Sequence, residues 1–218
     1  MNRTSALLVG LAFVLISFGL CAFYYGRMPA QMPIHWDAAG HANGYAPRLW
    51  GVFLWPAMVT GLWLLLLLLP VVSPKGFRID QFMGTYNLIV TAIIALMLFT
   101  SALAYAAAAG SSLPIPNLVI GAIGLLFVVI GNYMGKFRKN FFIGVRTPWT
   151  LASDEVWART HRLAGWIFIA GGLALVVQGF TGVNQAVLLA VVGIVTIVPI
   201  AYSFFEYKRV EGLGPNGT

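Results

Sequence analysis

The sequence predicts an all-α polytopic membrane protein with six transmembrane helices, and three observations support this fold class. Of the 218 residues, 60% are hydrophobic and only 9% are charged, whereas soluble domains carry about 25% charged residues. The mean hydropathy is +0.86. Long stretches of the chain have no ionisable side chain, and a transmembrane helix needs about 20 apolar residues. These values exclude an ordinary soluble enzyme, a disordered chain and a small disulfide scaffold.

The six spans follow from the positions of the charges. Residues 4–26, 49–74, 81–135 and 163–205 are free of Asp, Glu, Lys, Arg and His. The last two stretches are long enough for two helices each, and turn-forming residues interrupt both of them. Backbone polar groups in lipid must be satisfied within the segment, so we expect helices and not barrel strands. We place the spans near 5–25, 50–72, 84–108, 116–135, 163–182 and 186–205.

The distribution of Lys and Arg predicts the orientation of the chain. With the N-terminus inside, eleven of the thirteen Lys and Arg residues fall on inside segments. The positive-inside rule therefore predicts that both termini are cytoplasmic. The net charge of +7 is explained as a topology signal. We expect no direct nucleic-acid binding, because that function needs a basic domain and no loop is long enough to form one.

The outer loop, residues 26–49, contains two turn signals between extended flanks. The segment from Asp37 to Gly40 is typical of a tight turn, and we expect a small hairpin-like cap over the outer helix ends. His35, Asp37 and His41 have donor types that suit a metal or acid/base site. Their spacing is not a standard zinc pattern, so we assign no metal ligand. The alternative is that His35 and Asp37 hydrogen-bond the loop itself while Trp36 packs at the interface.

The inner loop, residues 136–162, combines large aromatic and basic side chains. Ser153 is a good N-cap and is followed by two acidic residues, so a helix should start there and continue into the fifth span. Glu155 and Arg159 can pair along it, and Trp157 and His161 share one face. One interpretation is an interfacial helix with Trp157 among the lipid headgroups. The other is a docking surface made by Arg146, Trp149, Trp157, His161 and Arg162.

The spans themselves contain no ionisable side chain, which argues against a pump or a proton-coupled carrier. Gly131 and Gly135 form a G-x-x-x-G pattern that suits close helix packing. The milder polar residues suit hydrogen bonds between helices, or a polar path through a channel. Such a path would need Asn87, Thr91, Asn132 and Gln178.

Two motifs resemble known families. The segment Asn140–Ser153, with Trp157, Thr160–Arg162 and Gly165, resembles the signature of the SdpI family, bacterial membrane proteins named for immunity to a secreted toxic peptide. The segment Pro33–Gly40, with Gly44 and Tyr45, is similar to an uncharacterised P-x-H-W-type domain often found at the N-terminus of the same proteins. That pattern often has an acidic residue where this chain has Asn43. We divide the chain into a two-span unit, 1–80, and a four-span unit, 81–218.

The resemblance implies a non-catalytic immunity or sensor protein of the bacterial cytoplasmic membrane that uses no cofactor. Its partners would be the lipid bilayer, a toxic peptide on the outer face and a cytoplasmic repressor or other protein on the inner face. The outer residues expected to bind are His35, Trp36, Asp37 and Gly40. The inner ones are Asn140, Gly144, Arg146, Thr147, Pro148, Trp149, Thr150, Trp157, Thr160, His161 and Arg162. The alternatives are a membrane enzyme with an outer-face His/Asp metal or acid/base site, and an uncharged-solute channel or carrier.

Overall fold

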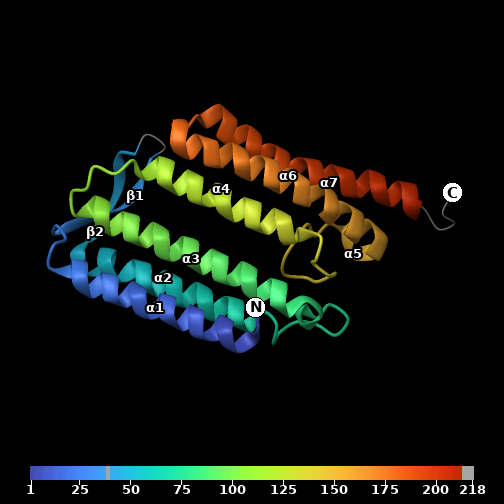
Figure 1. Cartoon of the computed structure of the whole chain (residues 1–218), viewed down its shortest axis with the longest axis horizontal. Coiled ribbons are helices and arrows are strands. Elements are labelled where there is room, and N and C mark those ends of the chain that lie inside the picture. The colour runs from blue at the N-terminus through green and yellow to red at the C-terminus, as the bar shows by residue number, and fades with distance from the viewer. Residues whose placement is uncertain (38–39, 213–218) are drawn as a thin grey trace.

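Six long helices dominate the structure, a computed structural model that describes residues 1–37 and 40–212 (Figure 1). They are α1 (Arg3–Tyr25), α2 (Arg48–Leu68), α3 (Met83–Ala108), α4 (Ile115–Met134), α6 (Asp154–Thr181) and α7 (Gln185–Val210). All six are long and apolar enough to cross a membrane, so the predicted fold class is confirmed. The shorter elements are strands β1 (Gln31–Trp36) and β2 (Ala42–Pro47), the 3-10 helix η1 (Ile79–Phe82) and helix α5 (Pro148–Ala152).

Two helix ends differ from the prediction, for local chemical reasons. Helix α2 ends at Leu68 and not at residue 72. Pro70 has no N–H to donate to the Leu66 carbonyl, and the Tyr86 hydroxyl of α3 donates to that carbonyl instead. Helix α7 continues past the predicted end at residue 205 to Val210. Its last turns are charged rather than apolar, and an ion pair between residues three apart, Glu206 and Arg209, supports them.

Helix α4 lies between two groups of helices (Figure 1). On one side α1, α2 and α3 pack against one another, and on the other side α6 packs against both α4 and α7. Helix α5 and the start of α1 lie at one end of the bundle, and the β1–β2 hairpin lies at the other. We call these the inner and outer ends, after the predicted orientation, which stays a prediction. The division of the chain at residue 80 also stays a prediction.

The contact between α4 and α6 depends on glycines that face each other. A Cβ on Gly131 would lie 2.6 Å from the Gly165 carbonyl oxygen, and one on Gly124 would lie 2.6 Å from the Gly172 carbonyl oxygen. The two backbones therefore touch directly, as small residues permit in membrane helices. In the predicted G-x-x-x-G pattern, Gly131 makes this contact. Gly135 does not: a Cβ there would meet no atom within 4 Å in the described part of the chain.

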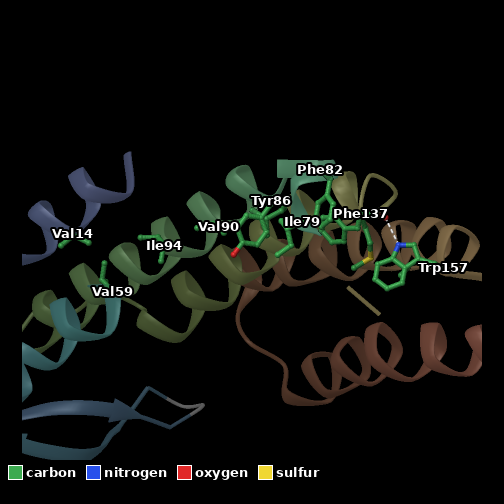
Figure 2. Close-up of a cluster of buried hydrophobic side chains, with 12 residues drawn as sticks. Val14, Val59, Ile79, Phe82, Tyr86, Val90, Ile94, Phe137 and Trp157 are labelled. Atoms are coloured by element: carbon green, nitrogen blue, oxygen red, sulfur yellow. Dashed lines mark hydrogen bonds between the residues drawn. The ribbon is translucent and has the colours of Figure 1, made fainter. Parts of the chain in front are cut away.

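A row of buried apolar side chains runs along the bundle to its inner end (Figure 2). It begins with Val14 and Val59, continues along α3 through Ile94 and Tyr86, and ends at Trp157 of α6. Burial of this kind of surface is worth about 25 cal/mol per Å² when the surface leaves water. In a bilayer the gain comes instead from packing and from excluding lipid. The row thus connects the first helices with the inner loop.

A second buried cluster holds the hairpin on the outer helix ends. It contains Cys21, Met28, Met32, Val52 and Tyr105. The Tyr105 hydroxyl donates to the Val52 carbonyl oxygen over 2.7 Å, and Met32 of β1 is fully buried. Strands β1 and β2 pair antiparallel with an irregular register near His35. The predicted hairpin-like cap is therefore confirmed. Of the predicted turn, Ala38 and Ala39 lie outside the described residues.

The α4–α6 contact gives a matched pair of substitutions. We expect Gly131→Ala to lower the stability of the protein by about 1–3 kcal/mol, because the added methyl overpacks a backbone contact. Gly135→Ala, one helical turn away, should leave stability nearly unchanged. Unfolding by denaturing detergent, followed by circular dichroism, would measure both. Equal stability of the two variants would contradict the close contact.

Candidate functional site

Asn140 organises the inner loop through its buried side-chain amide. Its Nδ2 donates to the carbonyl oxygens of Arg138 (2.8 Å) and Ile143 (3.1 Å). Its Oδ1 accepts from the backbone N–H groups of Phe142 and Ile143, both over 2.8 Å. Four hydrogen bonds from one fully buried amide close the loop on itself. Asn140 therefore shapes the loop from inside it.

His161 supports the same loop from α6. Its Nε2 accepts the Val145 backbone N–H over 3.0 Å, and its Nδ1 lies 2.8 Å from the Trp157 carbonyl oxygen. These partners fit a neutral ring with the proton on Nδ1. The ring stacks on Trp157 with centroids 4.0 Å apart. Gly144 has φ +103°, and a Cβ there would overlap His161 Nε2, so this turn requires glycine.

Two threonines fasten the end of the loop to α5 and α7. Thr147 and Thr150 form a capping box at the start of α5. The Thr147 hydroxyl also lies 2.9 Å from the Ser203 hydroxyl of α7. Trp149 packs edge-on against Phe204, the next residue of α7, with ring centroids 5.1 Å apart. The sequence did not indicate Ser203 and Phe204 as partners, because both residue types are equally typical of a lipid-facing helix.

A network of ion pairs joins the start of α6 to the end of α7. Arg159 pairs with Glu155, as predicted. It also donates over 2.7 Å to Glu206, which is 4% exposed and receives a second bond from Arg209 over 2.6 Å. Ser153 is the predicted N-cap of α6, and its hydroxyl accepts the Val156 backbone N–H. The same hydroxyl donates to Glu211 over 2.6 Å. The sequence indicated the Glu155–Arg159 pair but not the partners on α7.

Burial divides the predicted inner residues into two groups. Trp157 and His161 are 3% and 1% exposed, and the Trp157 indole N–H donates to the Phe137 carbonyl oxygen over 2.8 Å, the dashed line in Figure 2. The other buried members are Asn140, Thr147, Thr150 and Thr160. The exposed members are Arg146, Pro148 and Arg162, with Gly144 and Trp149 half-buried. A partner at this surface would therefore contact the exposed residues. Trp157 is buried in the protein and does not lie among the lipid headgroups.

A cavity of about 500 Å³, which we call the inner cavity, lies beneath this loop. Its walls come from α3, α4 and α7, with Phe168 of α6 and the loop itself. Three predicted site residues line it: Gly144, Arg146 and Thr147. The remaining lining is almost entirely aliphatic and aromatic. Its size suits a bound molecule, since ligand pockets measure about 300–1,000 Å³.

The outer hairpin pairs two of the three residues considered as metal ligands, Asp37 and His41, and bonds the third, His35, to Asn43. His35 Nδ1 lies 2.5 Å from Asn43 Oδ1, and Asp37 accepts the His41 backbone N–H over 2.9 Å. The His41 ring lies 3.6 Å from Asp37. Across residues 1–37 and 40–212, the structure brings together no group of three His, Cys, Asp or Glu side chains suited to a metal ion. The arrangement matches the alternative in which His35 and Asp37 bond within the loop.

A second cavity, the outer cavity, lies between the hairpin and the outer helix ends. It measures about 370 Å³ and is lined by His35, Trp36 and Asp37 together with apolar residues of α2, α3, α4 and α7. Gly40 takes φ +86°, and a Cβ there would crowd Pro116 of α4, another lining residue. Trp55 also lines the cavity, and its indole N–H has no hydrogen-bond partner among the described residues. The sequence did not single out Trp55, because a Trp inside a span normally indicates packing.

Two of the four polar residues considered for a channel, Asn87 and Gln178, bond locally and at opposite ends of the bundle. Asn87 donates over 3.5 Å to the Met1 carbonyl oxygen at the inner end. Gln178 accepts the Asn184 N–H over 2.6 Å near the outer turn between α6 and α7. These contacts place the two side chains in separate local roles rather than along one path.

Comparison with known proteins supports the resemblance noted in the sequence. Residues 136–203 match the SdpI/YfhL protein family, and residues 12–60 match a domain of unknown function, DUF1648. The chain is 26% identical over 208 residues to the immunity protein SdpI of Bacillus subtilis (strain 168), covering 94% of this chain and 97% of that protein. No solved structure matches the chain. With the six apolar helices, these matches indicate a multi-pass bacterial membrane protein.

The hydrogen bond from Val145 to His161 can be tested by a variant that keeps the ring stack. We expect His161→Phe to destabilise the loop by about 1–3 kcal/mol, because it leaves a buried backbone N–H without an acceptor. Amide hydrogen exchange measured by mass spectrometry should then speed up over residues 141–146. His41→Phe, at a ring that is 81% exposed, is the control. Unchanged exchange in His161→Phe would show that the loop does not depend on this bond.

Proposed function

We propose that this protein is a non-catalytic membrane immunity protein. It contains the SdpI-type segment and aligns with the immunity protein SdpI over nearly its full length. It would protect its cell against a secreted toxic peptide and relay the presence of that peptide to a cytoplasmic regulator. The observation that carries the proposal is that both sequence motifs line cavities at opposite ends of one bundle. Recognition on one face and reporting on the other would use these two sites.

The outer cavity has the properties expected of a peptide site. Its walls are mainly apolar, and His35, Trp36 and Asp37 supply polar groups at one edge. The buried Trp55 N–H lacks an acceptor among the described residues, and a peptide carbonyl would supply one. Buried donors are normally paired, so an acceptor brought by a ligand would gain a full hydrogen bond. We infer that a hydrophobic segment of the toxic peptide enters here.

The inner loop would be the surface that meets a regulator. Arg146, Pro148, Trp149 and Arg162 are its accessible members, and Arg and Trp are common anchors of protein interfaces. The loop is bonded to α7 at Ser203 and to α6 at His161. A shift of α6 against α7 would therefore move this surface, which gives a physical route between the two ends.

Binding accounts for the polar side chains better than catalysis does. His35 pairs with Asn43, Asp37 with His41, and the His161 ring is occupied on both nitrogens. Each group thus has a structural bond within its own loop. We therefore assign these residues to positioning and recognition and propose no reaction.

A survival assay tests the outer site. A sensitive strain that lacks its own immunity protein is given this chain and exposed to the secreted toxic peptide. We expect Trp36→Ala to lower the tolerated peptide concentration about tenfold or more, because aromatic anchors dominate binding energy. Trp50→Ala changes another Trp near the outer end that is 71% exposed and does not line the cavity, and it should protect normally. Both variants must reach the membrane in equal amounts.

The inner surface is tested by a separate readout in the same cells. Arg162→Ala should abolish recruitment of the regulator to the membrane fraction while survival is kept, and Arg138→Ala should change neither. Full protection by Trp36→Ala would overturn the assignment of the outer cavity. Equal sensitivity of cells with the wild-type chain and cells with empty vector would overturn the immunity function itself.

A further inference from the structure

We propose that the inner cavity binds an anionic phospholipid, with the phosphate at Arg146 and an acyl chain between α3 and α7. The inference goes beyond the immunity function and rests on the bundle lying in a membrane. It concerns a resident lipid and not the toxic peptide.

The acyl-chain part of the argument comes from the walls of the cavity. Its walls include Ile89 and Ile93 of α3 and Val195 and Ile200 of α7. Two of the lining residues, Thr196 and Ile200 of α7, are exposed. The cavity therefore reaches the surface of the bundle along α7, a helix apolar enough to cross a membrane. A volume of about 500 Å³ with such a lining is suited to a flexible hydrocarbon chain.

The headgroup part of the argument comes from charge. Among the described residues that line the cavity, Arg146 is the one that carries a charge. Its guanidinium donates to the Phe141 carbonyl oxygen, and no ion pair with a described carboxylate involves it. An arginine that is not paired with a carboxylate attracts a phosphate, and the planar guanidinium can bind it through two hydrogen bonds.

The acidic side chains nearby in sequence and on α7 do not neutralise Arg146, because they are engaged elsewhere. Asp154 pairs with Lys139 over 2.7 Å. Glu155 and Glu206 both pair with Arg159. The positive charge at the rim of the cavity is thus complementary to an anion from outside the chain.

A phospholipid satisfies both parts at once. The cation lies at the inner end of the bundle, and the apolar walls begin directly beside it. Anionic lipids are abundant in the cytoplasmic leaflet, which the inner end is predicted to face, and basic pockets between membrane helices bind their headgroups. A free anion would leave the apolar walls unused.

The test uses the purified full-length chain, stripped of lipid in detergent. Phosphatidylglycerol, phosphatidylethanolamine with the same chains, and glycerol 3-phosphate are titrated separately, and binding is followed by thermal stability and native mass spectrometry. We expect phosphatidylglycerol to bind about tenfold or more tightly than phosphatidylethanolamine. Both lipids offer a phosphate to Arg146, but the ammonium of phosphatidylethanolamine cancels the net negative charge and is repelled by the guanidinium. Arg146→Gln should remove this preference, and Arg146→Lys should keep part of it. Arg138→Gln, at an exposed arginine of the same loop, should behave as wild type.

A second pair of variants tests the chain-binding part without touching the charge. Ile200→Trp places a large ring at the mouth of the cavity and should weaken phosphatidylglycerol binding about tenfold. Ile197→Trp adds the same ring on the same helix, at a position that is 65% exposed and does not line the cavity. It should bind as wild type.

Three results would overturn the proposal. Equal affinity for the two phospholipids would overturn the preference for an anionic lipid. Binding of glycerol 3-phosphate as tight as that of phosphatidylglycerol would show a simple anion site. Unchanged lipid binding by Ile200→Trp would place the lipid elsewhere. None of these results depends on survival in the presence of toxin, so the lipid site and the immunity function can fail separately.

Discussion

Direct contact between the backbones of α4 and α6 determines where both ends of the bundle place their loops. Helix α4 leads into the inner loop, and α6 takes the chain out of it. Because glycines bring these helices together, the Phe137 carbonyl reaches the Trp157 indole. At the outer end the same helix α4 presents Pro116 to the hairpin. The α4–α6 distance, set by residues without side chains, thus positions the inner loop above its cavity.

The inner loop is held mainly by neutral groups buried inside it. The Asn140 amide and the His161 ring satisfy backbone groups that would otherwise be unpaired in a low-dielectric setting, where such bonds are strong. Charged residues act at the edges, where Arg159 and Glu206 connect α6 to α7. This division explains how a loop rich in polar residues can remain ordered while it exposes a small cationic surface around Arg146.

The sequence was sufficient for the elements that depend on local chemistry. Gaps between charges located the six helices, and Ser153 marked the start of α6. It was insufficient where partners lie far apart in the chain. Ser203 and Glu206 look ordinary on α7, since only the fold brings them to Thr147 and Arg159. Trp157 and His161 were expected to share a face, but which way that face points depends on how α6 packs.

The burial of Cys21 has a practical consequence for chemical labelling. It is the one cysteine of the chain, and it is enclosed at the outer end with Tyr105 and Met32. A thiol reagent added to intact cells would therefore find little native background to react with. A single cysteine introduced at Tyr45, which is 57% exposed on the hairpin, or at Lys136 on the inner loop becomes a clean reporter of which side of the membrane each end occupies.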